Sequence, residues 1–174
     1  MIKNLKHTTK INRLWAPWRA YFVTHQPVKG CIFCRALREK KDRKHYVIHR
    51  GQHVFAILNL YPYNNGHIMI APRRHIGDLV KLSPKESGEM FALAQRLIKQ
   101  MRRTLHAQGF NIGMNLGRVG GAGIPGHLHL HVVPRWNGDT NFMPILTQTK
   151  VISQSLAEVY KLLADKTVEH GRSR

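Results

Sequence analysis

The chain has 174 residues, a length that fits one domain or at most two. Hydrophobic residues make up 43% of it, enough for a buried core, which argues against wholesale disorder. Lys and Arg number 28 against 9 Asp and Glu, a formal net charge of +19. Such a field attracts polyanions, whether nucleotides, nucleic acids or anionic membranes, without choosing among them. We expect a basic flexible arm over residues 1–12, one domain over 13–165 and a polar tail over 166–174.

Two cysteines, Cys31 and Cys34, stand in the run Cys-Ile-Phe-Cys. They are too few for the disulfide framework of a small secreted domain, which leaves a redox pair, half of a metal site or ordinary buried thiols. No apolar stretch approaches the roughly 18 residues of a membrane-spanning helix, and no apolar segment of a secretory signal follows the basic N-terminus. These features predict a cytoplasmic, reducing compartment and no membrane partner.

Strands are expected where β-branched and aromatic residues dominate, and helices where apolar residues recur at helical spacing. In chain order the pattern predicts a short helix to about residue 43, strands at 46–48, 54–58 and 67–71, a long helix at 83–107, strands at 110–116 and 127–133, and a helix at 151–164. The order and the hairpin-like spacing of the first strands predict an α+β fold. We expect an antiparallel sheet with a long helix and shorter helices packed on it.

The long helix has the clearest boundaries. Ser83 can cap it, and Glu86, three residues later, completes a capping box. Pro84 suits the first helical position, and Gly109 is a natural stop. The glycine-rich stretch 117–126 lies between two strands and does not open a helix, which disfavours a Rossmann-type sheet.

Three histidines alternate with apolar residues in the predicted strand 127–133. On a strand, His127, His129 and His131 project to one face, about 6.6–6.8 Å apart at Cα. The residues between them can enter the core. Three interpretations remain open: a partly solvated polar face, a zinc site with an open coordination position, and nucleophilic catalysis on phosphorus by a neutral imidazole.

Residues 127–133 match the motif His-φ-His-φ-His-φ-φ, where φ is hydrophobic, and so resemble the histidine triad family. The likeness covers about residues 14–165, and its other matches are Cys31, Cys34, Asn59, Gly66, His67, Pro72 to Ile76 and Asn115. The segments 14–19 and 134–142 resemble the branch of dinucleoside tetraphosphate (Ap4A) phosphorylases and hydrolases.

This resemblance implies a five-stranded antiparallel sheet, a homodimer with two sheets side by side, and cleavage of a nucleoside-phosphate bond at the α-phosphorus. By position, His129 is the nucleophile that forms a covalent nucleotidyl-imidazole. His131 stabilises the phosphate charge, and His67 is a further histidine near the triad. The implied nucleotide contacts are Phe33 to the base, Asn59 and Leu60 to the ribose, and Asn115 to the phosphate.

Zinc-bearing members of the family bind the metal with a Cys-x-x-Cys pair, a histidine after the third strand and the first triad histidine. Those positions are Cys31, Cys34, His75 and His127 here. Two thiolates and two imidazoles make a closed tetrahedral site, which suits structural zinc rather than catalytic zinc.

One departure concerns the phosphate site. Many members carry Ser or Gln shortly before the triad, where this chain has Gly123-Ile124-Pro125-Gly126. Phosphate contacts would then come from backbone N–H groups, that of Gly123 among them, or from Arg118. The departure leaves phosphorolysis and hydrolysis both open.

Three alternative functions remain. One is hydrolysis of nucleoside phosphoramidates or adenylylated conjugates. The second is a nucleic-acid-binding protein that removes adenylate, which the basic arm suggests but which is not favoured. The third is an inert nucleotide-binding regulator.

Overall fold

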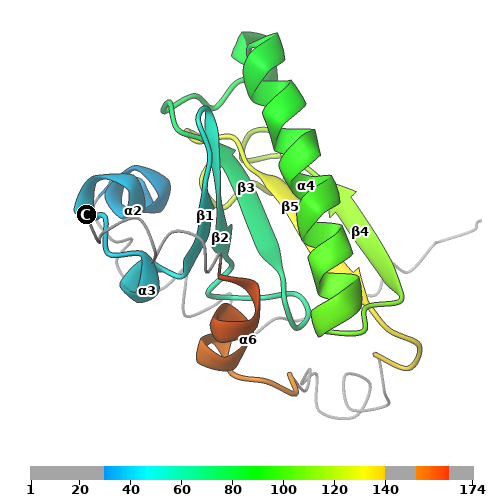
Figure 1. Cartoon of the computed structure of the whole chain (residues 1–174). Helices are drawn as coiled ribbons and strands as arrows, with labels where there is room; N and C mark the ends of the chain where they lie inside the picture. The colour runs from blue at the N-terminus through cyan, green and yellow to red at the C-terminus, as the bar shows by residue number, and fades with distance from the viewer. Residues whose placement is uncertain (1–29, 140–151, 165–174) are drawn as a thin grey trace, which may run out of the picture.

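A computed structural model describes residues 30–139 and 152–164 (Figure 1). In chain order the elements are α2 (Ile32–Glu39), α3 (Asp42–His45), β1 (Val47–Arg50), β2 (Val54–Leu58), β3 (Ile68–Pro72), the short 3-10 helix η1 (Leu79–Lys81), α4 (Pro84–Thr104), β4 (Gly109–Gly113), β5 (Leu130–Arg135) and α6 (Leu156–Leu163). The predicted arm and tail, 1–12 and 166–174, lie outside the described residues. Within the described ranges, no helix is long and apolar enough to cross a membrane. The cytoplasmic compartment stays a prediction.

The five strands form one antiparallel sheet in the order β1-β2-β3-β5-β4. β2 pairs with β3 along its whole length. β5 lies between β3 and β4, so that His131 has Met69 opposite it on one side and Gly113 on the other. The predicted α+β fold with a five-stranded antiparallel sheet is confirmed.

The helix α4 begins as its sequence predicts. The Glu86 N–H donates to the Ser83 hydroxyl at 3.3 Å, and the Glu86 carboxylate accepts from the Ser83 N–H at 2.9 Å. Each residue thereby satisfies an N–H that the first helical turn leaves without a partner. A bidentate ion pair from Arg74 also reaches the Glu86 carboxylate, at 2.7 and 2.8 Å. The start of α4 is therefore tied to the segment that follows β3.

The end of α4 differs from the prediction. The helix ends at Thr104, and His106 takes the left-handed conformation, with φ at 52°. The Ala107 N–H turns back to the Met101 carbonyl at 3.4 Å, which closes the last turn. Gly109 opens β4 instead of ending the helix. The stop was misplaced because His106 rather than a glycine makes the left-handed turn.

Two predicted boundaries near the C-terminus also change. The last helix begins at Leu156 rather than 151, because Ser155 and Glu158 form a second capping box. The strand predicted at 127–133 is β5 at Leu130–Arg135. Before it, the Leu128 N–H bonds the Ile76 carbonyl at 2.6 Å rather than a neighbouring strand. His127 and His129 therefore precede the strand.

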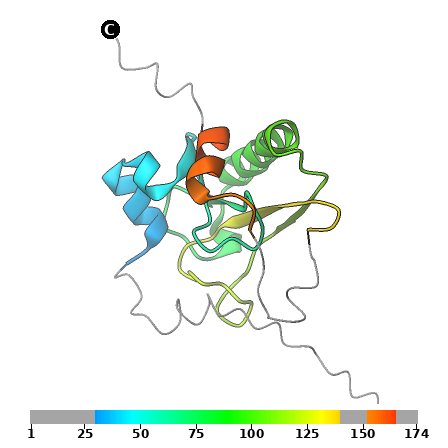
Figure 2. The same ribbon diagram turned by 90° about the horizontal axis from the view of Figure 1, so that it is seen from below.

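The sheet separates two apolar clusters. On one face, which we call the α4 face, alternate strand residues such as Ala56, Ile70 and Val132 pack under α4 and α6. Figure 2 shows α6 beside α4 on the same side of the sheet. The opposite face, which we call the α2 face, buries a smaller cluster around Phe33 and Phe55. His131 alternates with Leu130 and Val132 of the α4 face, so it points to the α2 face.

Candidate active site and metal centre

Four sulfur and nitrogen ligands converge at the N-terminal end of α2. Cys31 and Cys34 lie at the start of that helix, His75 follows β3, and His127 precedes β5. The His127 Nδ1 lies 3.2 Å from the Cys31 Sγ, 3.6 Å from the Cys34 Sγ and 3.3 Å from the His75 Nδ1. All four ligand atoms lie within 4.8 Å of one another. The structure thus brings together the four residues predicted to bind metal.

The spacing of these residues and the tautomer of His127 fit a tetrahedral metal ion. Zinc bonds of about 2.0–2.1 Å to nitrogen and about 2.3 Å to sulfur hold tetrahedral ligand atoms about 3.3–3.8 Å apart. Moreover, the His127 Nε2 lies 2.8 Å from the Pro72 carbonyl oxygen, which can only accept. The proton must therefore sit on Nε2, and Nδ1 turns a lone pair toward the cluster.

The predicted nucleophile, His129, is oriented by the metal cluster's own histidine. The His129 Nδ1 lies 2.8 Å from the His127 carbonyl oxygen, so Nδ1 donates and Nε2 carries the lone pair. The residue is 5% exposed. Burial lowers the pKa of His129, which favours the neutral ring. Such a ring has a nucleophilic nitrogen at Nε2.

Phe33 separates the metal cluster from the predicted nucleophile. Its ring lies on α2, with its centroid 4.9 Å from that of His127 and 5.1 Å from that of His129. The side chain is 0% exposed. Its described contacts are therefore with protein, and it fixes the positions of both imidazoles. Contact with a nucleobase stays a prediction.

His131 and His67 form a second imidazole pair. The His67 Nε2 lies 2.9 Å from the His131 Nδ1. On its other side the His67 Nδ1 accepts the Tyr63 backbone N–H at 3.1 Å, so Nε2 must carry the proton and donate to His131. His131 then keeps its proton on Nε2. Burial, with the charges of His131 and His129, lowers the pKa of His67 to about 3, so it stays neutral.

Tyr63 is the residue of this site that the sequence did not single out. Besides its N–H, its ring stacks on His67 with centroids 4.8 Å apart and planes 28° apart. Its centroid lies 5.9 Å from that of His131. The run Tyr61-Pro62-Tyr63-Asn64 is typical of a loop. In the sequence, the one feature that points to a role for Tyr63 in the site is its position shortly before His67.

The remaining predicted residues lie around these histidines or in the glycine-rich loop. The Asn59 Nδ2 lies 3.3 Å from the His67 Nδ1, which joins Asn59 to the pair. Leu60, next to it, is 48% exposed and available for contact. The Asn115 amide donates to the Gly121 carbonyl at 3.5 Å, inside the loop that also holds the exposed Gly123. Phosphate contacts by Asn115 and Gly123 stay predictions.

Comparison with known proteins identifies the family of the chain. The profile of the HIT domain matches residues 40–138, more than half of the chain. An AP-4-A phosphorylase of Mycobacterium tuberculosis is 40% identical over 163 residues, with 89% of this chain and 84% of that protein covered. The chain belongs to the HIT, or histidine triad, family.

One solved structure gives the same assignment, and a second shows the same fold. A Zn-bound histidine triad family protein from Mycobacterium smegmatis superposes with a TM-score of 0.63 at 30% identity, covering 77% of this chain and 90% of that one. A histidine triad nucleotide-binding protein from Sulfolobus tokodaii superposes with a TM-score of 0.62 at 23% identity, covering 76% of this chain and 89% of that one. The second likeness shows the fold alone.

Proposed function

We propose that the protein is a nucleotidyl hydrolase or phosphorylase that cleaves dinucleoside polyphosphates such as Ap4A at the α-phosphorus. The observation that carries the proposal is the orientation of His129, whose Nδ1 is held by the His127 carbonyl at 2.8 Å while Nε2 keeps its lone pair. The 40% identity to a protein named AP-4-A phosphorylase supports the substrate class. The net charge of +19 favours encounter with a polyphosphate.

In the first step the His129 Nε2 attacks the α-phosphorus. A P–N bond forms, the P–O bond to the bridging oxygen breaks, and the leaving polyphosphate keeps the electron pair as an anion or takes a proton from water. With Ap4A the leaving group is ATP, and AMP stays on His129. The fixed Nδ1 hydrogen bond aims the attacking nitrogen and disperses the positive charge that the ring acquires.

His131 supports that step as a hydrogen-bond donor, and His67 is the residue that positions His131. The Tyr63 N–H and His67 hold the His131 proton on Nε2, where it can donate to a phosphate oxygen. Donation to an oxygen that gains charge in the transition state stabilises that state more than the bound substrate.

In the second step a water or phosphate oxygen attacks the same phosphorus, the P–N bond breaks, and the electron pair returns to the His129 Nε2. The proton that the attacking oxygen loses passes to bulk water. Water yields AMP and phosphate yields ADP. Asn115, Arg118 and the Gly123 N–H are the groups proposed to face the phosphate, with Asn59, Leu60 and Phe33 toward the nucleoside. The same covalent chemistry accommodates a phosphoramidate or an adenylylated conjugate.

We propose structural zinc as the cofactor. Cys31, Cys34, His75 and His127 would hold the metal, and a set of two thiolates and two imidazoles leaves no position for substrate. When bound, zinc supplies a rigid link between α2 and the segment that enters β5. The Zn-bound relative from Mycobacterium smegmatis supports the choice of metal. The homodimer stays a prediction of the resemblance, tested by sedimentation velocity.

The decisive variant is His129→Ala. We expect turnover of Ap4A to fall by about a thousandfold or more, because the covalent route is lost, while metal content and circular dichroism stay those of the wild type. The matched control is His106→Asn, which replaces an exposed histidine after α4 with a residue that tolerates the left-handed conformation. Wild-type turnover in His129→Ala refutes the proposed nucleophile.

A substrate panel then separates the two activities. Ap4A, an adenosine phosphoramidate and an adenylylated amine are assayed with and without inorganic phosphate, and products are identified by chromatography. Formation of ADP only when phosphate is present indicates phosphorolysis, and AMP under both conditions indicates hydrolysis. Preference for the phosphoramidate over Ap4A would overturn the proposed substrate class while leaving the nucleophile intact.

A further inference from the structure

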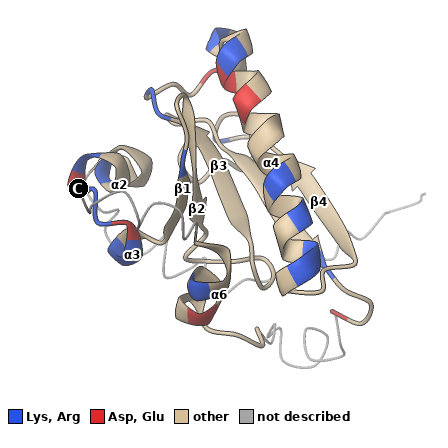
Figure 3. Cartoon of the chain, viewed as in Figure 1, with Lys and Arg blue, Asp and Glu red and all other residues tan. Residues whose placement is uncertain are grey.

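The helices α2 and α3 and the junction between them carry a dense run of cations. Residues 35–44 contain six Lys or Arg and two acids, a net charge of +4. The most exposed side chains of this run are all basic, and they are Arg38, Lys40, Lys41, Arg43 and Lys44. Figure 3 shows Lys and Arg on both helices, beside β1 and away from α4. The run therefore presents a positive surface to solvent.

The two acids of this run pair with other residues. The Glu39 carboxylate lies 2.9 Å from the His45 Nε2 and accepts from Lys44 at 3.3 Å. The Asp42 carboxylate accepts two hydrogen bonds from Arg50, at 2.6 and 2.9 Å. Within the described ranges no carboxylate forms an ion pair with the other four exposed cations, which we call the α2–α3 surface: Arg38, Lys40, Lys41 and Arg43.

A half-buried guanidinium fixes the two helices relative to each other. Arg50, at the end of β1, donates to the Ala36 carbonyl of α2 at 2.9 Å and binds the Asp42 carboxylate of α3 at the same time. On its inner side α2 is anchored by Phe33 and Ala36, both 0% exposed. The α2–α3 surface is thus carried on a fixed frame, so little backbone entropy is lost when a ligand binds to it.

The spacing of the four cations fits a polyphosphate backbone. They lie within residues 38–43, so their Cα atoms span at most about 19 Å. Each strand of a nucleic-acid duplex presents a phosphate about every 3.4 Å along the axis, which places roughly five phosphates within that span. Lys and Arg bind such phosphates through contacts that do not depend on the base sequence.

Two other polyanions fit this surface less well. Proteins that lie on anionic membranes add apolar side chains that enter the lipid, whereas the exposed side chains here are all charged. Single-stranded nucleic acids stack their bases on exposed aromatic rings. In this segment Phe33 is buried, and Tyr46 packs edge-on against Tyr160. A duplex, which offers its phosphates to the outside, requires neither feature.

We propose that the α2–α3 surface binds the phosphate backbone of a nucleic-acid duplex without regard to base sequence. Its four cations contact phosphates, and the frame held by Arg50 keeps them in place. The surface contains no residue of the metal cluster or of the candidate active site, and it does not include the basic arm. It adds a binding function that does not depend on the nucleotidyl chemistry proposed for His129.

The test uses the full-length wild-type chain and short labelled duplexes of DNA and of RNA, each in two unrelated sequences. Binding is followed by fluorescence anisotropy at a series of salt concentrations, with single strands and phosphatidylserine vesicles as competitors. We expect equal affinity for the two sequences of each duplex. Four phosphate contacts should contribute about −3.6 to the slope of log affinity against log salt with DNA. The relative affinities of the two duplexes show whether DNA or RNA fits the surface better.

A charge variant separates this surface from the net charge of the chain. It removes the four cations together: Arg38→Gln, Lys40→Gln, Lys41→Gln and Arg43→Gln. We expect the salt slope to become shallower by about 3–4, and the affinity to fall about tenfold or more, because each lost cation is a lost phosphate contact. Circular dichroism and metal content check that the variant folds.

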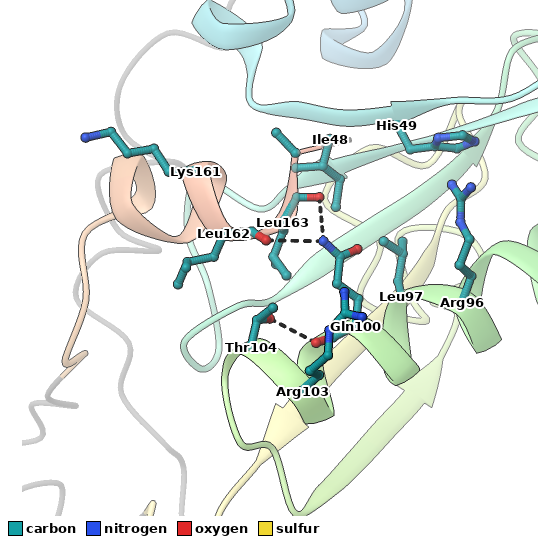
Figure 4. Close-up of a pocket in the computed structure, with 11 residues that line it drawn as sticks. Ile48, His49, Arg96, Leu97, Gln100, Arg103, Thr104, Lys161, Leu162 and Leu163 are labelled. Atoms are coloured by element: carbon teal, nitrogen blue, oxygen red, sulfur yellow. Dashed lines mark hydrogen bonds between the residues drawn. The ribbon is translucent and has the colours of Figure 1, made fainter. Parts of the chain in front are cut away.

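The matched control removes the same charge from α4. It replaces four exposed cations of that helix: Lys85→Gln, Lys99→Gln, Arg102→Gln and Arg103→Gln. Arg103, for example, lines a pocket between α4 and α6 (Figure 4), and these helices cover the face of the sheet opposite to that of Phe33. The control is expected to change the slope by less than about 1, since salt screens charges that do not touch the duplex.

Three results would overturn the proposal. One is an absence of saturable binding to either duplex at low salt, in correctly folded protein. Another is an equal change of slope in the two quadruple variants, which would reduce the effect to the field of the whole chain. The third is tighter binding to single strands or to the vesicles than to either duplex. None of these results bears on the His129 proposal, since turnover of Ap4A is measured separately and without nucleic acid.

Discussion

The two faces of the sheet are held together by different forces. The α4 face buries a continuous aliphatic cluster under a 21-residue helix, and hydrocarbon contact holds it. The α2 face has a smaller apolar cluster, and directed contacts among cysteines and histidines complete it. Hydrocarbon contact tolerates small shifts, whereas ligand and hydrogen-bond geometry does not. Stability and chemistry should therefore respond to different substitutions.

The largest effect is expected from a change at the metal cluster. His75→Gln removes one of four ligands, and a metal-binding free energy on the order of 10 kcal/mol is then weakened or lost. Bound zinc should fall, and the melting temperature should drop and no longer respond to a chelator. Metal analysis and calorimetry measure both.

The control for that variant is His45→Gln. His45 lies in α3, which follows α2, and its ring contacts Glu39 rather than the metal cluster. Its zinc content should equal that of the wild type. Stoichiometric zinc in His75→Gln would show that His75 is not a ligand.

A substitution that leaves a cavity under α4 should lower the free energy of unfolding and leave the zinc content unchanged. Leu97 is 2% exposed in the centre of the aliphatic cluster, so Leu97→Ala is expected to lower the free energy of unfolding by about 2–5 kcal/mol. Denaturant titration measures the change, and zinc content should not move. Phe91→Ala, at a 54% exposed site on the same helix, should cost less than about 0.5 kcal/mol. Equal losses in the two variants would contradict the assigned core.

The smallest effect concerns the link between the start of α4 and the segment that carries His75. The Arg74 guanidinium, followed by the Ser83 hydrogen bonds, lowers the pKa of Glu86 to about 2. In the unfolded chain the carboxyl has its ordinary, higher pKa, so the ionised form stabilises the fold above about pH 4.5. This stabilisation is lost as the pH falls toward about 2.

Glu86→Gln removes that contribution. We expect it to cost on the order of 1–2 kcal/mol at pH 7, a modest figure because Arg74 is 57% exposed. The difference from the wild type should shrink between about pH 5 and pH 2, measured by denaturant titration at each pH. A difference independent of pH would contradict an ionic origin.

Local signals explain what could be predicted from the sequence. The start of α4 was predicted because Ser83 and Glu86 recognise each other within one turn, with no help from the rest of the fold. The strand residues of β2 and β3 were found because composition alone marks buried strands. The four metal-binding positions came from family likeness, and the structure brings them together.

Long-range contacts explain what could not be predicted. The alternation of residues predicts a strand at His127, but His127 lies before β5, with its Nδ1 3.2 Å from the Cys31 Sγ. That contact joins residues far apart in the chain, so a local pattern contains no sign of it. The role of Tyr63 could not be predicted because its main contact with His67 is made by a backbone N–H, which every residue except proline possesses. The helix ends at Thr104 because His106 takes a left-handed conformation. Histidine does not predict that conformation in the way that glycine does.

The metal cluster also has a consequence for the order in which a newly made chain acquires its parts. Its ligands come from segments separated by 41 and 52 residues, so closing the cluster encloses long stretches of chain. During synthesis Cys31, Cys34 and His75 emerge early and must wait for His127. His129 emerges two positions later, and its ring bonds the carbonyl of His127. The last ligand and the proposed nucleophile therefore leave the ribosome almost together, and the chain has no proposed nucleophile before its metal site can close.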